Sequence, residues 1–469
     1  GPAVFNPEPF ADFFDLFVIG DGEEALLQLL DTVASRNDLT RKEILLELSQ
    51  IEGFYIPSLY NVSYDDETRS ITRQSLHVKA PAKIRKRTVK NLDQAYFPAK
   101  PIVSYLEVVH DRAVLEIMRG CQRGCRFCQA GMVYRPVRER NVENLTGQAG
   151  QQLKCTGYDE ISLTSLSTLD YSGIKKLVNN LTETCTPKGI GISLPSLRVD
   201  RFSIELAEQV QKVRKTTLTL APEAGSQRLR NIINKNVTSE QLYMAAEAAF
   251  KSGWLAIKLY FMIGLPGENE EDLEELLNML KEVKRIGRQF GRRMPEIKAS
   301  CAIFVPKAHT PFQWQPQVRT EDISLKKAIL TKYKIKNIKL NFHDSPTSYL
   351  EGLIARGDRR MSSLLFKAWQ NGCRFDSWTE FFNYDNWRKA LDEADFDLDD
   401  IIYRRRSYAE DLPWDFIDIG VSKDYLQEEA ERSLIGETTA DCRYDGCNNC
   451  NVCTALKVDL DIKETSTCA

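Results

Sequence analysis

Short apolar segments alternate with amphipathic ones through the middle of the chain. The apolar segments occupy residues 113–117, 160–165, 191–196, 216–220, 255–263 and 297–304. Between them, apolar positions at helical spacing over 142–153 lead to Gly157, and Thr238 and Gln241 form a possible capping box before another helix. Six strand–helix units predict an α/β fold, in which right-handed crossovers curve a parallel sheet into a partial (β/α)6 barrel. Ligands of such barrels bind at the carboxyl ends of the strands.

The flanking segments differ in pattern from this barrel. Residues 15–33 read as a buried strand, a Gly turn and a helix, which is how the last unit of a larger α/β domain would look. The predicted organisation is the final part of an N-terminal α/β domain at 1–50, a connecting segment at 51–110, the barrel at 111–316, a mainly helical region at 317–440 and a Cys-rich metal-binding tail at 441–469.

Composition limits the class of protein. The chain has 469 residues, 42% of them hydrophobic, which suits a globular protein with a substantial core. It has no long apolar run and no secretory pattern near its first residue, so we expect no membrane insertion and a cytoplasmic or organelle-stroma location. The net charge of −3 gives no global attraction to nucleic acid, although the basic stretches 83–90 and 404–406 could contact phosphate or simply be solvated.

Seven of the twelve cysteines fall in two tight groups, as metal ligands do. The first group, Cys121, Cys125 and Cys128, forms CxxxCxxC on a Gly-rich loop after the first predicted strand. A 4Fe-4S cluster usually takes four thiolates, so three would leave one iron open to a substrate. The plainer alternatives are a zinc site that lacks a ligand, or three structural thiols.

This motif, with Phe127 before its third cysteine and its place at a barrel mouth, resembles the radical S-adenosylmethionine (radical SAM) superfamily. The resemblance implies an enzyme in which SAM chelates the open iron of a 4Fe-4S cluster. One electron then cleaves SAM to a 5'-deoxyadenosyl radical, so Cys121, Cys125 and Cys128 are the implied catalytic residues. A reductant such as flavodoxin or ferredoxin is the implied partner.

The resemblance also implies contacts to SAM at the barrel mouth. The implied residues are Phe127, Thr164, Ser165, Ser196, Arg198, Glu223, Met262, Gly264 and Phe312. Hydroxyl and guanidinium groups suit the amino and carboxylate groups of SAM, and Gly264 would let the backbone approach the adenine. Each polar residue also has a plainer role as a strand-end cap or helix-dipole partner, and Gly264 as part of a tight turn.

Motifs along the whole chain narrow the resemblance. The opening segment, 265–268, 307–312, 356–360 and the Cys-rich end resemble uncharacterised radical SAM proteins with an N-terminal cobalamin-type domain. That class implies methyl transfer. The cobalamin-ligand signature DxHxxG is absent, so either that part of the site lies upstream or the protein works without cobalamin.

Two other functions are compatible with the sequence. A methylthiotransferase of RNA or ribosomal protein has a similar core, but that family places three auxiliary cysteines before the core, whereas the first cysteine here is Cys121. A non-catalytic scaffold that binds Fe-S clusters or RNA is the second alternative. The substrate, RNA or protein, has no readable motif.

The second group, Cys442, Cys447, Cys450 and Cys453, has the spacing C-x4-C-x2-C-x2-C. Gly446 and the neighbouring asparagines allow the tight turns that would close four thiols on one metal centre. Zinc is the plainer occupant, but its four-cysteine sites usually join two separated CxxC pairs. The spacing is similar to that of ferredoxins, so an auxiliary Fe-S cluster is favoured. Such a cluster could relay an electron or bind substrate if the tail folds back to the barrel mouth.

Overall fold

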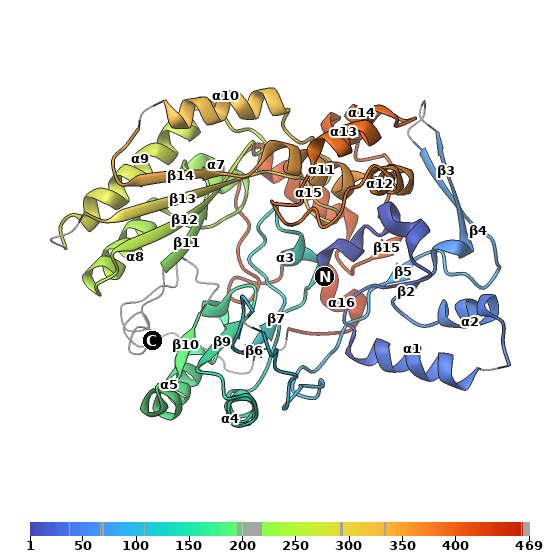
Figure 1. Ribbon diagram of the computed structural model, residues 1–469, viewed down its shortest axis with the longest axis horizontal. Helices are drawn as coiled ribbons and strands as arrows, with labels where there is room; N and C mark the ends of the chain where they lie inside the picture. The colour runs from blue at the N-terminus through green and yellow to red at the C-terminus, as the bar shows by residue number, and fades with distance from the viewer. Residues whose placement is uncertain are drawn as a thin grey trace.

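Two parallel sheets form the core of the protein (Figure 1). The structure is a computed structural model, which describes residues 1–460 and 462, except 37, 66, 68, 69, 107, 195–198, 200–217, 291–293 and 333. The first sheet has the order β10 (Gly191–Ser193), β9 (Glu160–Thr164), β6 (Ala113–Glu116). The second has the order β11 (Leu218–Glu223), β12 (Ala256–Ile263), β13 (Glu296–Ile303), β14 (Ile338–Phe342). All six predicted strands are present, so the α/β fold and the partial barrel are confirmed.

The second sheet extends further than the sequence predicted. β14 pairs in parallel with β13, from Ile297 opposite Ile338 to Cys301 opposite Phe342. This strand comes from the region expected to be mainly helical, so the barrel sheet extends past the predicted boundary at 316. Within the described residues, β10 and β11 do not pair with each other.

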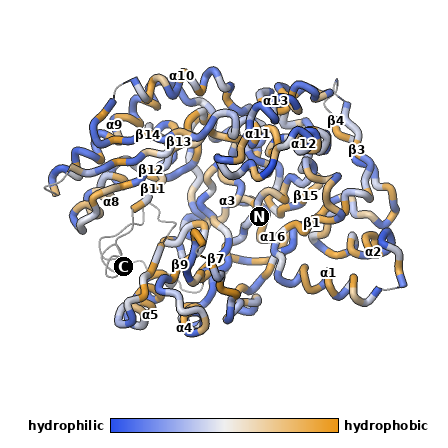
Figure 2. The backbone as a smooth tube through the Cα atoms, viewed as in Figure 1, coloured by the Kyte–Doolittle hydropathy of each residue, from blue (hydrophilic) through white to orange (hydrophobic). Residues whose placement is uncertain are grey.

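The helices that cover the sheets begin and end as their sequences indicate. In the first half they are α4 (Val142–Thr156) and α5 (Ile174–Cys185), and in the second half α7 (Gln227–Ile232), α8 (Ser239–Lys251), α9 (Glu270–Gly287) and α10 (Thr320–Thr331). Gly157 ends α4 in the left-handed conformation, with φ of 73°. Thr238 and Gln241 form the predicted capping box of α8. Hydrophobic and hydrophilic positions alternate along surface helices such as α9 and α10 (Figure 2).

The N-terminal segment joins the connecting segment. The predicted strand, turn and helix are β1 (Phe17–Val18), Gly20 to Gly22 and α1 (Glu23–Ser35), followed by α2 (Arg41–Leu48). β1 pairs antiparallel with β2 (Phe54–Tyr55). The remaining elements here are η1 (Pro2–Phe5), η2 (Glu8–Phe13), η3 (Pro57–Leu59), the hairpin β3 (Tyr60–Asp65) and β4 (Ser70–Ser75), and β5 (Ile84–Arg85).

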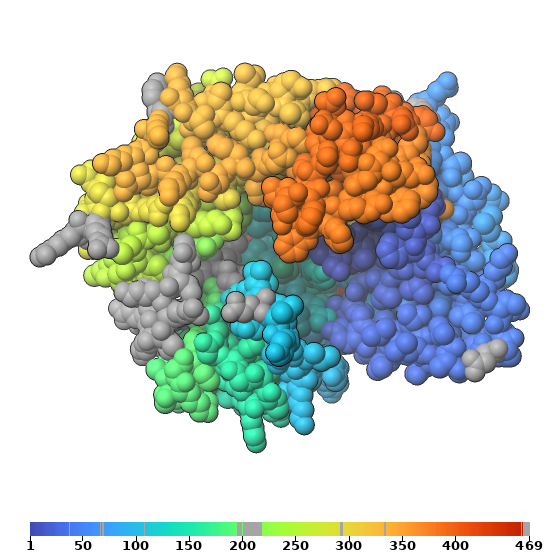
Figure 3. All heavy atoms as spheres, viewed as in Figure 1, coloured from blue at the N-terminus to red at the C-terminus, as the bar shows by residue number. Residues whose placement is uncertain are grey.

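The C-terminal elements first run along the upper edge of the molecule as seen in Figure 1 and then return to its centre, beside the N-terminus and α3 (Gln129–Val133). They are α11 (Ser345–Arg356), α12 (Met361–Gln370), α13 (Tyr384–Asp392), α14 (Leu398–Tyr403), β15 (Ile417–Asp418), α15 (Lys423–Leu434) and α16 (Val452–Leu456). β15 pairs with β5, and one buried cluster joins Phe5 and Ile19 to Trp414 and Val452. The orange and blue parts of the surface are therefore in contact in Figure 3. No helix in the described residues is long and apolar enough to span a membrane.

Candidate active site

The first cysteine group lies on the loop between β7 (Met118–Arg119) and α3, directly after the first barrel strand. Gly120 starts this loop with φ of 92°, and a Cβ atom there would lie 2.6 Å from the Pro136 carbonyl oxygen. Only glycine fits this turn. At the other end, Cys128 is the N-cap of α3, and its Sγ accepts the Gly131 backbone N–H at 3.4 Å. The loop is thus fixed at both ends.

The three thiols of this loop act on one another. Desolvation, and after it the thiols of Cys125 and Cys121, raise the pKa of the Cys128 thiol to about 12, while the Gly131 N–H and Lys235 act in the opposite direction. In the described part of the chain, no three His, Cys, Asp or Glu side chains are arranged to hold a metal ion. Three neighbouring thiols, a backbone N–H directed at sulfur and a nearby cation nevertheless suit an Fe-S cluster, whose negative charge such groups stabilise. Such a cluster supplies one-electron chemistry.

The cation beside this loop is Lys235, which sequence reasoning missed. Its Nζ lies 3.0 Å from Glu223 Oε1, at the end of β11. Glu223 has φ of 68°, the left-handed region that a residue with a side chain rarely adopts. Strain of this kind concentrates at functional sites. The carboxylate expected to contact SAM is therefore held by a lysine that also faces Cys128.

Three apolar residues expected at the SAM site come together. Phe127, Met262 and Phe312 belong to one cluster with Leu265, and the Phe312 ring meets Phe304 edge-on at 5.8 Å. They come from the cysteine loop, β12 and the segment after β13, which meet at one end of the barrel. An apolar surface there suits a flat ring such as adenine.

The other expected contacts have local partners. A Cβ atom at Gly264 would lie 2.3 Å from Val318 Cγ1, and its φ is 79°, so the packing of Val318 and the turn explain this glycine. The Thr164 carbonyl accepts the Ile117 N–H at 3.1 Å, and Ser165 Oγ lies 3.1 Å from Thr168 Oγ1. Ser196 and Arg198 lie outside the described residues.

The second cysteine group lies next to the first. Cys450 is buried in the same cluster as Met132 and Val133 of α3, the helix that follows Cys128. The thiols of Cys450 and Cys447 help to raise the pKa of Cys453, and those of Cys450 and Cys453 help to raise the pKa of Cys442. The Asn449 N–H donates to Cys447 Sγ at 3.4 Å. The tail thus folds back beside the cysteine loop, as an auxiliary site would require.

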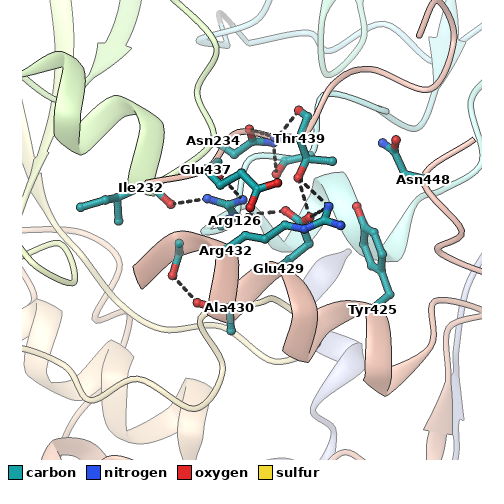
Figure 4. Close-up of polar contacts among 12 residues, drawn as sticks. Arg126, Ile232, Asn234, Tyr425, Glu429, Ala430, Arg432, Glu437, Thr439 and Asn448 are labelled. Atoms are coloured by element: carbon teal, nitrogen blue, oxygen red, sulfur yellow. Dashed lines mark hydrogen bonds and ion pairs between the residues drawn. The ribbon is translucent and has the colours of Figure 1, made fainter. Parts of the chain in front are cut away.

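A buried arginine fastens the cysteine loop to the C-terminal segment. Arg126, between Cys125 and Phe127, is fully buried, and its Nε lies 3.1 Å from Glu429 Oε2 on α15 (Figure 4). Its other nitrogens donate to the carbonyls of Ile232 at 3.0 Å and Glu437 at 2.7 Å. The position inside the CxxxCxxC motif was the one signal that could have identified it.

Two further contacts strengthen this connection. Asn234 Nδ2 donates to the Gly124 carbonyl at 3.1 Å, while its Oδ1 accepts the Thr439 N–H at 2.9 Å. The Asp170 carboxylate forms an ion pair with Arg123 of the loop, and the Asp170 backbone carbonyl accepts a hydrogen bond from Arg443 Nη1 of the tail at 3.0 Å. Desolvation raises the pKa of Asp170, but the two guanidinium groups outweigh it and hold that pKa far below its ordinary value. The middle of the loop, from Arg123 to Arg126, is therefore held by the C-terminal segment.

Comparison with known proteins agrees with this geometry. Residues 115–280 match the family model described as the Radical SAM superfamily, and residues 1–57 match a model described as Radical SAM proteins, N-terminal. The uncharacterised protein MJ0966 of Methanocaldococcus jannaschii is 32% identical over 371 residues, which are 78% of this chain and 72% of that protein.

Other similarities cover less of the chain or are weaker. The ribosomal protein uS12 methylthiotransferase RimO of Pelotomaculum thermopropionicum is 27% identical over 41% of this chain, and the match spans less than half of that protein, 44%. The solved structure of OxsB, described as a cobalamin-dependent S-adenosylmethionine radical enzyme, aligns with a TM-score of 0.45 at 13% identity, over 97% of this chain and 70% of that one. With the long match to MJ0966 and the family model across the cysteine loop, the chain belongs to the radical SAM superfamily of enzymes.

Proposed function

We propose that the protein binds a 4Fe-4S cluster through Cys121, Cys125 and Cys128 and uses it to cleave SAM reductively. The observation that carries this proposal is the juxtaposition of the three thiols with Lys235 and Glu223, next to the apolar cluster of Phe127, Met262 and Phe312. The thiols would hold the cluster. The Lys235–Glu223 pair offers charges for the amino acid part of SAM, and the apolar cluster excludes water from the adenine side.

The decisive measurement is release of 5'-deoxyadenosine from SAM by anaerobically reconstituted, reduced protein. We expect Cys125→Ala to abolish this release, because the cluster loses one of its three protein ligands. Cys155→Ala is the matched control, since Cys155 is exposed on α4 and lies outside both cysteine groups. Retention of SAM cleavage by Cys125→Ala would overturn the assignment. A wild type that carries the cluster but cleaves no SAM would instead identify a binding scaffold.

We infer that the radical serves methyl transfer to RNA or protein. The resemblance of the motifs at 265–268, 307–312 and 356–360 to the cobalamin-associated class supports methyl transfer, and the segment 1–50 is proposed to be the end of a cobalamin-type domain. Methylthio transfer is the second candidate, favoured by the relatives named as methylthiotransferases and by a second thiol group beside the first. Mass spectrometry of RNA and ribosomal proteins from cells that lack the protein separates the two, because a lost methyl and a lost methylthio group differ by one sulfur.

The tail thiols form part of the same proposal. We propose that Cys442, Cys447, Cys450 and Cys453 hold an auxiliary Fe-S cluster, supported by their mutual electrostatic contacts and the N–H donated to Cys447 Sγ. Iron, sulfide and zinc counts of the wild type and of the Cys447→Ala, Cys450→Ala double variant test it. We expect the double variant to lose iron and sulfide in equal amounts. One zinc per chain beside a single 4Fe-4S cluster would show the tail to be a structural site.

A further inference from the structure

A chain of hydrogen bonds leads from the first cysteine group toward the second. Cys128 Sγ accepts the Gly131 N–H at 3.4 Å. The carbonyl oxygen of the same Gly131 accepts Arg135 Nε at 3.0 Å. Gly131 makes both bonds, one through its N–H and one through its C=O, so the Arg135 guanidinium is connected to the Cys128 sulfur through a single residue of α3.

The other end of this guanidinium faces the tail. Arg135 is only 1% exposed, and its Nη1 lies 3.4 Å from the Tyr425 hydroxyl. Burial alone would lower the pKa of Arg135, but the Tyr425 hydroxyl and the Cys450 thiol raise it above its ordinary value. Arg135 in turn lowers the pKa values of the Cys442 and Cys453 thiols, which desolvation raises. One buried cation therefore faces three of the four tail thiols.

One nitrogen of Arg135 lacks an acceptor of good geometry among the described residues. Nη2 is buried without a partner at normal hydrogen-bond geometry, and the Cys450 thiol interacts with the guanidinium both by charge and as a weak side-chain acceptor. A buried N–H donor left unpaired costs on the order of 1–3 kcal/mol, and more on a charged group. This nitrogen also lies near the cysteine loop, because a Cβ atom on Gly124 would be 3.7 Å from it. Within the described residues, the Cys450 thiol is thus a weak acceptor for this cation, and a thiolate sulfur at the same place would be a stronger one.

We propose that Arg135 is a positioning residue shared by the two cysteine groups, which donates its Nη2–H to the Cys450 sulfur of an Fe-S cluster bound at the tail. This inference rests on the proposed auxiliary cluster. An Fe-S cluster with four thiolates is anionic and gains a further negative charge when it is reduced, so a guanidinium hydrogen-bonded to its sulfur stabilises the reduced form more than the oxidised form. Arg135 therefore raises the reduction potential of the tail cluster and places it next to the cluster on Cys121, Cys125 and Cys128.

The test isolates the tail cluster in a Cys125→Ala background and follows its reduction by electron paramagnetic resonance in a redox titration. We expect Arg135→Gln to lower the potential, so that at fixed ambient potential the ratio of reduced to oxidised cluster falls about tenfold, which is about 59 mV for one electron. Arg135→Lys, which keeps the charge but not the planar donor geometry, should produce a smaller shift.

Arg138→Gln is the matched control. Arg138 is equally buried three residues away, but it binds Asp21 and the Val89 carbonyl. Its loss should reduce stability without moving the potential. The inference is overturned if the Arg135 variants keep all the iron of the tail cluster and that cluster has the same reduction potential as in the protein with Arg135. It is also overturned if Arg138→Gln shifts that potential by an equal amount.

A measurement on the unsubstituted chain covers the case in which the Arg135 variants do not fold. When both clusters are reduced, their unpaired spins should couple, and the coupling should vanish in Cys125→Ala and in the Cys447→Ala, Cys450→Ala variant. Absence of coupling with both clusters present overturns the shared role of Arg135 and leaves the auxiliary cluster standing. Zinc in the tail overturns both, while SAM cleavage at the first cysteine group is measured independently.

Discussion

Arg126 Nε lies 3.1 Å from Glu429 Oε2, and both side chains are fully buried although 303 residues separate them in the chain. Arg126→Ala leaves the Glu429 carboxylate with Arg432, at 3.1 Å, and the Thr439 hydroxyl as partners. Breaking a buried pair typically costs about 3–5 kcal/mol when nothing compensates the charge that remains, so with these partners we expect a loss of about 2–3 kcal/mol in the free energy of unfolding measured with urea. Arg285→Ala breaks an exposed pair with Glu282 and should cost less than about 1 kcal/mol. Equal losses in the two variants would contradict the importance of the buried pair.

The turn at Gly120 predicts a second effect. Gly120→Ala requires a Cβ atom 2.6 Å from the Pro136 carbonyl oxygen and 2.7 Å from that of Tyr134, at φ of 92°. We expect lower iron incorporation and a lower melting temperature, because the start of the cysteine loop must move. Gly147→Ala is the control, since it lies within α4 with open space around it and should stabilise by up to about 1 kcal/mol. Normal iron content in Gly120→Ala would show that the loop adapts.

A pH dependence follows from His309. Burial lowers its pKa from 6.5 to about 4, while its Nε2 lies 2.9 Å from the Phe5 carbonyl oxygen. Below pH 6.5 the unfolded chain takes up a proton that the folded chain refuses, so stability is highest above this pH and falls as the pH drops toward 4. The loss approaches about 3 kcal/mol. Urea unfolding of metal-free protein at pH 7.5 and 5 should show it, and His309→Gln should flatten it. An unchanged slope in that variant would assign the loss to other groups.

The Lys235–Glu223 pair predicts an effect on both redox behaviour and SAM binding. Lys235→Met leaves the Glu223 carboxylate unpaired at a strained position and removes a cation beside Cys128. We expect the reduction potential of the first cluster to fall and the apparent affinity for SAM to weaken. Lys251→Met, at the exposed end of α8, should change neither. Unchanged SAM binding in Lys235→Met would place the amino acid part of SAM elsewhere.

The barrel was predictable because its information is local. Each strand is a short apolar run, and Gly157 and the Thr238–Gln241 box mark helix boundaries within a few residues. The convergence of Phe127, Met262 and Phe312 was implied by the resemblance to the radical SAM superfamily, and it agrees with the rule that parallel strands end at one edge. β14 escaped prediction because its alternating pattern over 338–342 is brief and its lysine and asparagine are exposed.

The contacts around the cysteine loop could not be read from the sequence, because they join distant segments. Nothing near Arg126 in the sequence indicates Glu429, and Asn234 looks like an ordinary polar residue after a helix. Arg135 carries no motif of its own. Such partners are determined by the way the tail folds back onto the loop. A single sequence contains no pattern that indicates a side-chain contact between residues about 300 positions apart.

The same connection has a consequence for protein synthesis. The cysteine loop leaves the ribosome long before Glu429 and Thr439, the residues that close over it through Arg126 and Asn234. At roughly 5–20 residues per second, the 303 residues between Arg126 and Glu429 take roughly 15–60 s to translate. During that interval the nascent loop stays open to iron delivery, and release of the C-terminal segment then covers it.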